Sequence, residues 1–244
     1  MELIVLGSSS KGNGYILTNG SVSLIIEAGV KFDEVLKALN YDTSSIVGCI
    51  VTHEHGDHAG NIKEYVHNGV QVYTSKGTIS KVGEMYGLNP IAENELFAIS
   101  DFNIIPFKVQ HDCVEPFGYF INHPETGRFC FITDAAYSPY KFNGLNNMII
   151  ECNYIDEVVY DMVKNDKLPS WRRDRLSNSH MSLERCEELI ECNDISQVIN
   201  IVLIHLSKDN CVYGTALDRI KSVSMKKVTI AKPGVRIDFN KTPF

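Results

Sequence analysis

The run Thr52–His58, with the sequence THEHGDH, constrains the fold of this chain more than any other segment. Three imidazoles and two carboxylates lie within its last six residues, and this mixture of side chains suits zinc, iron or manganese. An apolar, strand-like segment at 48–52 leads directly into the run. Because open α/β sheets place their sites at the carboxyl ends of strands, the run predicts a metal centre at a sheet edge.

Spacing within the run divides it between two metal ions. His53 and His55 are two residues apart, so on an extended backbone their side chains point in the same direction. Asp57 and His58 are adjacent and follow Gly56, where the chain can turn. We therefore expect two pairs of ligands that face two different metals.

Three more polar residues, His111, Asp134 and His205, each come after a strongly apolar, strand-like segment. Any one of them alone would be interpreted as a structural polar group. Together with the first run, they are expected to converge on one sheet edge and to complete the ligand set. The predicted metal ligands are therefore His53, His55, Asp57, His58, His111, Asp134 and His205.

His180 has a different setting, because it lies just before a predicted helix that Ser182 can cap. One interpretation makes His180 a proton donor near the metals. The other makes it a solvent-exposed neighbour of a helix N-terminus. The two remaining histidines, His67 and His123, are predicted to lie at the surface.

Short strand-like segments rich in Val, Ile, Phe and Tyr recur along the chain and alternate with segments of helical periodicity. This order favours two sheets packed face to face with helices outside. Asn19-Gly20 predicts a hairpin turn.

No Pro/Gly/Ser-rich linker divides the chain, which predicts one domain over residues 1–244. The polar, aperiodic segment 166–180 is interpreted as a long functional loop or a helix–loop insertion. Strands are predicted at 3–6, 14–18, 22–26, 48–52, 70–74, 102–109, 119–121, 128–133, 148–152, 198–204, 227–230 and 235–239, and helices at 32–39, 59–67, 75–85, 155–165, 183–192 and 216–223.

Composition and charge restrict the cellular setting and the partners. The apolar run at 3–6 is too short for a signal peptide, and no stretch has the length of a membrane span. Seven cysteines, an odd number without a CxxC pair, are typical of a reducing compartment. We therefore expect a cytoplasmic protein without a membrane partner. The net charge of −7 argues against a broad electrostatic grip on duplex nucleic acid, although two divalent ions would add positive charge where a phosphate binds.

The run at 53–58 resembles the HxHxDH signature of the metallo-β-lactamase superfamily, and His111, Asp134 and His205 match the order of that superfamily's later ligands. Further motifs resemble the YycJ/WalJ branch and extend the likeness over nearly the whole chain. They are Gly7–Asn13 (GSSSKGN), Glu27–Gly29 (EAG), Glu151–Asn153 (ECN), Trp171–Ser177 (WRRDRLS), His180–Ser182 (HMS) and His205–Asn210 (HLSKDN).

The resemblance implies an αββα sandwich with the metals between the sheet edges. His180 aligns with a histidine that is thought to protonate the leaving group in the related tRNA 3′-processing ribonuclease Z. Members of the branch are described as nucleases or phosphodiesterases. Carried over by position, His53, His55 and His111 would hold one metal, Asp57, His58 and His205 the other, and Asp134 would bridge them.

Three residues depart from the branch pattern. Glu27 replaces an aspartate that usually lies behind the ligands, and its longer side chain is expected to shift a ligand's orientation. Ser179 replaces the glycine that usually precedes the histidine at 180. Tyr154 stands where a histidine often follows the ExN segment. None of the three changes the ligand set.

We predict a binuclear phosphodiester hydrolase, and a DNA or RNA nuclease in particular, with metal-bound hydroxide as the nucleophile. Asp57 and His180 are the predicted catalytic residues, and His180 is the general acid. The cofactors are two divalent ions, zinc or alternatively manganese or iron. The arginines within 172–175 lie next to Trp171 and suit binding of a phosphate backbone, with one aromatic ring available for stacking. A solvated helix or loop face explains these arginines equally well. The predicted substrate contacts are Lys11, Asn13, Trp171, Arg172, Arg173, Arg175, Lys208 and Asn210.

Other functions remain open at this stage. A cyclic-nucleotide or other small phosphodiesterase would use the same core chemistry. A thioester, lactone or lactam hydrolase is also possible on this fold, because metals polarise carbonyl groups as well as phosphates. A metal-dependent binding module without catalysis is the third alternative. The sequence also leaves open whether the chain forms a homo-oligomer.

Overall fold

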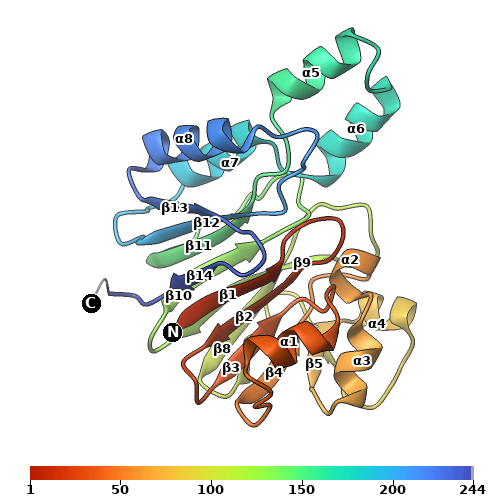
Figure 1. Cartoon of the computed structure of the whole chain (residues 1–244), viewed down its shortest axis with the longest axis vertical. Coiled ribbons are helices and arrows are strands. Elements are labelled where there is room, and N and C mark those ends of the chain that lie inside the picture. The colour runs from red at the N-terminus through yellow and green to blue at the C-terminus, as the bar shows by residue number, and fades with distance from the viewer. Residues whose placement is uncertain (243–244) are drawn as a thin grey trace.

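The computed structural model describes residues 1–242 and consists of two seven-stranded sheets packed face to face (Figure 1). The first sheet contains, in spatial order, β14 (Arg236–Asp238), β1 (Glu2–Gly7), β2 (Gly14–Thr18), β3 (Ser23–Ile26), β4 (Ile46–Ile50), β5 (Val72–Ser75) and β6 (Leu88–Ile91). The second contains β13 (Lys227–Ile230), β12 (Asn200–Ile204), β11 (Leu145–Glu151), β10 (Gly127–Ile132), β9 (Phe117–His123), β8 (Phe102–Lys108) and β7 (Phe97–Ile99).

Each sheet joins an antiparallel part to a parallel part. In the first sheet, β1, β2 and β3 are antiparallel, and the pairs from β3 to β6 are parallel. In the second sheet, β7 to β10 are antiparallel, and β10 to β13 are parallel. The predicted hairpin turn at Asn19-Gly20 is confirmed, with Gly20 at a φ of 89°. Parallel strands end at the same sheet edge, which brings the residues that follow them together.

Helices cover the outer face of each sheet, as Figure 1 shows. On the first sheet these are α1 (Phe32–Ala38), α3 (Ile62–His67) and α4 (Lys76–Val82), and on the second they are α7 (Leu183–Glu191) and α8 (Tyr213–Ser224). One apolar core lies between the sheets and two more lie beneath the outer helices. The predicted αββα sandwich is confirmed, because each sheet buries both of its faces.

A helical hairpin, α5 (Asp156–Lys164) and α6 (Ser170–Ser179), projects from the sandwich (Figure 1). We call the segment 156–179 the arm. Val159 and Leu168 of the arm pack with Tyr154 at its base in a small apolar cluster, which is separate from the three larger cores. Of the two interpretations of segment 166–180, the helix–loop insertion is therefore correct and the long loop is wrong. The short strands β6 and β7 were not predicted, because LNPI and FAI show little alternation.

Among the residues that the structure describes, no helix has both the length and the apolar character needed to cross a membrane.

Candidate metal centre

The predicted ligands meet at one edge of the sandwich because each follows a strand. His53 comes after β4, while Asp57 and His58 lie on the short helix α2 (Gly56–Ala59). Asp134 lies two residues after β10 and His205 directly after β12, and their backbones adopt left-handed φ angles of 46° and 54°. Such a conformation costs a non-glycine residue roughly 1–3 kcal/mol and is concentrated at functional sites. Here it turns both side chains toward the cluster, where Asp134 Oδ1 lies 2.8 Å from His205 Nδ1.

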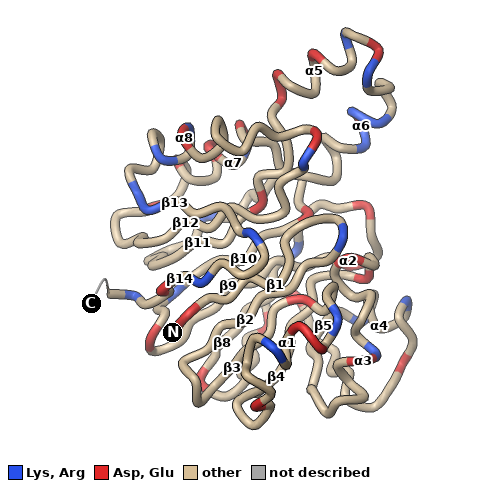
Figure 2. The backbone as a smooth tube through the Cα atoms, in the orientation of Figure 1, with Lys and Arg blue, Asp and Glu red and all other residues tan. Residues whose placement is uncertain are grey.

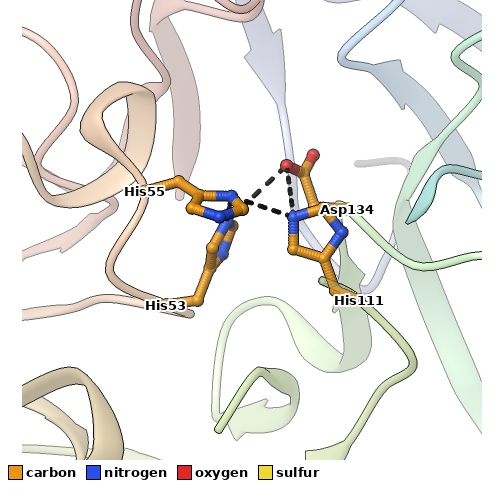
Figure 3. Close-up of side chains that lie close together, drawn as sticks. All are labelled: His53, His55, His111 and Asp134. Atoms are coloured by element: carbon orange, nitrogen blue, oxygen red, sulfur yellow. Dashed lines mark hydrogen bonds and ion pairs between the residues drawn. The ribbon is translucent and has the colours of Figure 1, made fainter. Parts of the chain in front are cut away.

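Four of these side chains form a first group, and Figure 3 shows them converging. His55 Nδ1 lies 3.1 Å from His53 Nε2 and 3.0 Å from His111 Nε2. Asp134 Oδ2 lies 3.6 Å from His53 Nε2 and 3.4 Å from His111 Nε2. Three imidazole nitrogens and one carboxylate oxygen therefore face a common point.

A second group shares Asp134 with the first. Asp57 Oδ2 lies 3.4 Å from both His58 Nε2 and His205 Nε2. Asp134 Oδ2 lies 3.3 Å from His58 Nε2. The structure thus brings all seven predicted ligands together, and it divides them as the spacing of the first run predicts.

Oxygen atoms behind the histidines orient their rings. His53 Nδ1 donates to Thr52 Oγ1 over 2.9 Å, and that hydroxyl donates to Glu27 over 2.6 Å. The same carboxylate lies 3.3 Å from His58 Nδ1. His111 Nδ1 donates to the Ser179 carbonyl over 2.7 Å. A proton held on the far nitrogen leaves the lone pair of the near nitrogen facing the cluster, as metal ligands require.

Glu27 is fully buried and has a left-handed φ of 70°. Its side chain reaches Thr52 and His58 together, so one carboxylate supports a histidine in each ligand group. The expected shift of a ligand's orientation by the longer side chain stays a prediction. At the other departures from the branch pattern, Ser179 contacts His111 through its backbone, and Tyr154 is buried at the base of the arm.

The directions in which the pKa values of the donor groups are shifted agree with a site for divalent cations. Burial lowers the pKa of His53 well below its ordinary value, which keeps that imidazole neutral. Burial would raise the pKa of Asp134, but the charges of His205 and His58 hold it well below its usual range. His205 Nε2 is buried without a hydrogen-bond partner among the described residues. Burial would lower the pKa of His58 and of His205, but the charge of Asp134 and the neighbouring carboxylates raise both well above the ordinary value. Histidines and ionised carboxylates facing one another are ligands suited to zinc, manganese or iron, and bound cations would take the place of the imidazole protons.

Glu151, at the end of β11, is a site residue to which the sequence analysis assigned no role. Its carboxylate is fully buried and accepts hydrogen bonds from the backbone amides of Ala135 at 3.0 Å and Met181 at 3.1 Å. It also lies 2.8 Å from His180 Nδ1 and 3.0 Å from His205 Nδ1. A carboxylate that ends an apolar strand was the available signal, since the same pattern identified Asp134.

His180 lies beside the metal ligands rather than on a free helix end. Its ring is 5.4 Å from that of His205 and 5.5 Å from that of His111, between centroids. Burial lowers the pKa of His180, but the charge and hydrogen bond of Glu151 outweigh this and raise it above its ordinary value. This position agrees with the first interpretation and not with a solvent-exposed helix end, and the role of His180 as a proton donor stays a prediction. Ser182 caps α7, as predicted, by accepting from the Arg185 amide.

A cleft of about 680 Å³ opens over the two ligand groups. His55, His111 and His180 line it, as do Asp57 and several of the predicted substrate contacts. Arg172 and Arg175 face it from α6, three residues apart on one side of the helix. The predicted contacts that line the cleft are Lys11, Arg172, Arg175, Lys208 and Asn210.

Three predicted substrate contacts do not line the cleft. Asn13 is fully buried and donates to Asp57 Oδ2 over 3.2 Å, so this prediction is wrong and Asn13 supports the ligands instead. Trp171 is 65% exposed outside the cleft. Arg173 points away as well and pairs with Asp174 at 2.6 Å. Helix phase explains the division, because one face of α6 meets the cleft and the other meets solvent.

The other two histidines differ from each other. His67 is exposed, as predicted. His123 is only 4% exposed and packs on the Phe102 ring with centroids 4.3 Å apart, so the predicted surface position is wrong. A histidine at the end of an antiparallel strand fills part of the core here instead of binding a metal.

The αββα fold and the histidine–aspartate cluster at its edge define a metal-dependent hydrolase. The chain belongs to the beta-lactamase superfamily domain family, which matches residues 15–206. The predicted membership of the metallo-β-lactamase superfamily is thereby confirmed.

Known proteins resemble the chain over most of its length. An exodeoxyribonuclease YycJ from Bacillus anthracis is 27% identical over 226 residues, which cover 86% of this chain and 84% of that protein. An exodeoxyribonuclease WalJ from Streptococcus pneumoniae is 24% identical, with coverage of 96% and 91%. The crystal structure of zinc-bound PqqB from Methylobacterium extorquens shares the fold, with a TM-score of 0.71, 14% identity and coverage of 98% and 100%. The predicted likeness to the YycJ/WalJ branch is therefore confirmed at low identity.

Proposed function

We propose that this protein is a two-metal phosphodiesterase that cleaves nucleic acid, with DNA as the first candidate substrate. One observation carries the proposal: a single cleft joins the metal ligands and His180 to cationic side chains from three separate segments. These cations are Lys11 after β1, Lys208 after β12, and Arg172 and Arg175 on α6. The exodeoxyribonuclease names of the relatives support the same substrate class.

Each set of residues in the cleft has its own role in the proposed reaction. When bound, the two metals supply Lewis acidity and an activated water at neutral pH. Asp134 belongs to both groups of ligands and would join them, whereas Asp57 belongs to the second group only. Glu151 holds Nδ1 of His180, and Nε2, which has no hydrogen-bond partner among the described residues, would protonate the leaving oxygen. The cationic side chains bind phosphates on either side of the scissile one.

Local charge supports a nucleic-acid substrate although the net charge is −7. Figure 2 shows Lys and Arg positions along the arm, interspersed with Asp and Glu. Of the basic side chains on α6, Arg172 and Arg175 line the cleft. No broad basic face is needed if only a few phosphates near the metals are bound. This arrangement favours single-stranded or end-bound substrates over an internal stretch of duplex.

The test is a substrate panel on purified protein loaded with Mn²⁺ or Zn²⁺. End-labelled single-stranded DNA, duplex DNA and RNA of the same sequence are compared with a cyclic nucleotide, bis(p-nitrophenyl) phosphate and a thioester. We expect cleavage of the small diester and of at least one polymer, with DNA preferred. Hydrolysis of the thioester alone would refute the proposal, and hydrolysis of the cyclic nucleotide without any polymer would assign a small phosphodiesterase instead.

Two matched variants sharpen this panel. Arg172→Ala removes a cation from the cleft, and Arg173→Ala removes one from the solvent side of the same helix. Loss of one phosphate contact should lower the slope of log affinity against log salt by roughly 0.7–0.9 in the first variant only. Equal effects of both variants on DNA binding would show that α6 binds by general attraction and not through the cleft.

Metal identity and cellular location belong to the same proposal. We place zinc first, with manganese and iron as alternatives, and elemental analysis of protein purified without chelators decides among them.

We also propose a cytoplasmic location. All seven cysteines are free thiols, which suits a reducing compartment.

A further inference from the structure

Asp112 and Arg175 form an ion pair at the lip of the cleft. Arg175 Nε donates to Asp112 Oδ2 over 3.0 Å, and both side chains line the cleft. Asp112 directly follows His111 in sequence, and its Oδ1 lies 3.4 Å from His111 Nε2. The pair therefore connects α6 of the arm to the loop that carries one of the metal ligands.

The pair occupies only one edge of the Arg175 guanidinium. A guanidinium presents five N–H donors in a rigid, planar fork. Asp112 accepts from Nε, and neither Nη1 nor Nη2 has a hydrogen-bond partner among residues 1–242. Those two nitrogens can bind a phosphate while Asp112 keeps its own contact. Asp112 thus holds Arg175 in place without taking the donors that an anion needs.

Stability does not account for the pair. The Arg175 side chain is 66% exposed and that of Asp112 39%, and ion pairs this exposed add little to folding. A second contact joins the same two segments, because His111 Nδ1 donates to the Ser179 carbonyl four residues further along α6. Two adjacent residues, His111 and Asp112, therefore fix the cleft-facing side of α6 at two points.

We propose that Asp112 is a positioning residue that orients Arg175 to bind the phosphate next to the scissile one. This inference rests on the proposed function and narrows it to substrates with at least two consecutive phosphates. The benefit is entropic. An exposed arginine loses its rotamer freedom when it binds a ligand, and Asp112 has already removed part of that freedom.

Steady-state kinetics of the metal-loaded protein test this inference with a single-stranded oligonucleotide and with bis(p-nitrophenyl) phosphate. We expect Asp112→Ala to raise KM for the oligonucleotide roughly three- to tenfold, the cost of ordering one side chain. Arg175→Ala should raise it at least as much, and the double variant no more than Arg175→Ala. Asp112→Asn keeps an acceptor for Nε and should be intermediate. Arg173→Ala, from the opposite face of α6, is the control and should leave KM unchanged.

Several outcomes would overturn the inference while the proposed function stands. Additive effects of Asp112→Ala and Arg175→Ala would show that the two residues act independently. A lower KM in Asp112→Ala would show that its charge repels the substrate. Lower metal content, or an equal loss of rate on the small diester, would mean that Asp112 acts on the metal centre. If the wild-type protein cleaves neither substrate, the proposed function fails and the inference with it.

Discussion

The carboxylate of Glu151 lies 2.8 Å from Nδ1 of His180, and both groups are largely removed from solvent. The same Oε1 atom lies 3.0 Å from Nδ1 of His205. One buried carboxylate therefore supports both the proposed proton donor and a proposed metal ligand. Removal of His180 should therefore affect the proposed proton donor alone, whereas removal of Glu151 should affect both the proton donor and the metal ligand.

His180→Ala should lower kcat for an oligonucleotide by roughly 10²–10⁴-fold, the usual contribution of a general acid. The loss should be much smaller with bis(p-nitrophenyl) phosphate, because nitrophenolate leaves without a proton. Parallel rate measurements on the two substrates, with metal content determined, check this. His67→Ala, on an exposed histidine, is the control. An equal loss on both substrates would mean that His180 does not protonate the leaving group.

Glu151→Gln should affect both the rate and the metal centre. It removes the charge that raises the pKa of His180 and the partner that orients His205. Four donors converge on the buried carboxylate, so the change should also destabilise the fold by about 1–3 kcal/mol. Kinetics, metal content and thermal unfolding are measured on the same preparation. A variant that loses rate but keeps full metal affinity would separate Glu151 from the support of His205.

Glu27→Gln should weaken both metal sites, because Glu27 supports His53 through Thr52 and contacts His58 directly. Loss of such a partner lowers metal affinity roughly 10–100-fold. Titration calorimetry of the metal-free protein with Zn²⁺ measures both binding steps. Glu34→Gln, in an exposed pair with Lys37, is the control. Weakening of a single step would contradict the link through Thr52.

Removal of metal should lower the unfolding temperature. A ligand present at 1,000 times its Kd stabilises the native state by about 4 kcal/mol, which corresponds to roughly 8–16 °C for a chain of this size. Calorimetric scans with and without a chelator measure the shift, and added Zn²⁺ should restore the original value. An unchanged Tm after verified loss of metal would argue that the cluster binds metal only weakly.

Gly29→Ala should disturb the second ligand group, because its new methyl carbon would lie 1.8 Å from the backbone oxygen of Asp57. We expect a destabilisation of about 1–3 kcal/mol, or roughly 2–12 °C in Tm, with weaker metal binding. Gly214→Ala, at a helical position with nothing within 4 Å, is the matched control and should not destabilise. Unchanged stability in Gly29→Ala would show that the backbone around Gly29 and Asp57 moves to accommodate the methyl group at little cost in free energy.

Several predictions failed where the residues concerned depend on distant parts of the chain. Asn13 lies in a polar, glycine-containing loop, which is typical of a substrate contact. It is buried only because that loop packs against Asp57, 44 residues away. His123 resembles any surface histidine in sequence, and its place in the core follows from packing on Phe102. The helix α6 has too little apolar periodicity to be recognised, since its apolar contacts come from a small cluster shared with α5.

The sequence by itself determined which histidines and carboxylates come together, their division into two groups and the two-sheet architecture. Ligands two residues apart on a strand, or adjacent after a glycine, have directions that the local backbone dictates. Only the tertiary structure decided that Glu27 supports both groups, that Glu151 joins His180 to His205, and that Arg172 and Arg175 face the cleft while Arg173 does not. Those relationships depend on which strand ends meet and how the arm is turned, and contacts between distant residues set both.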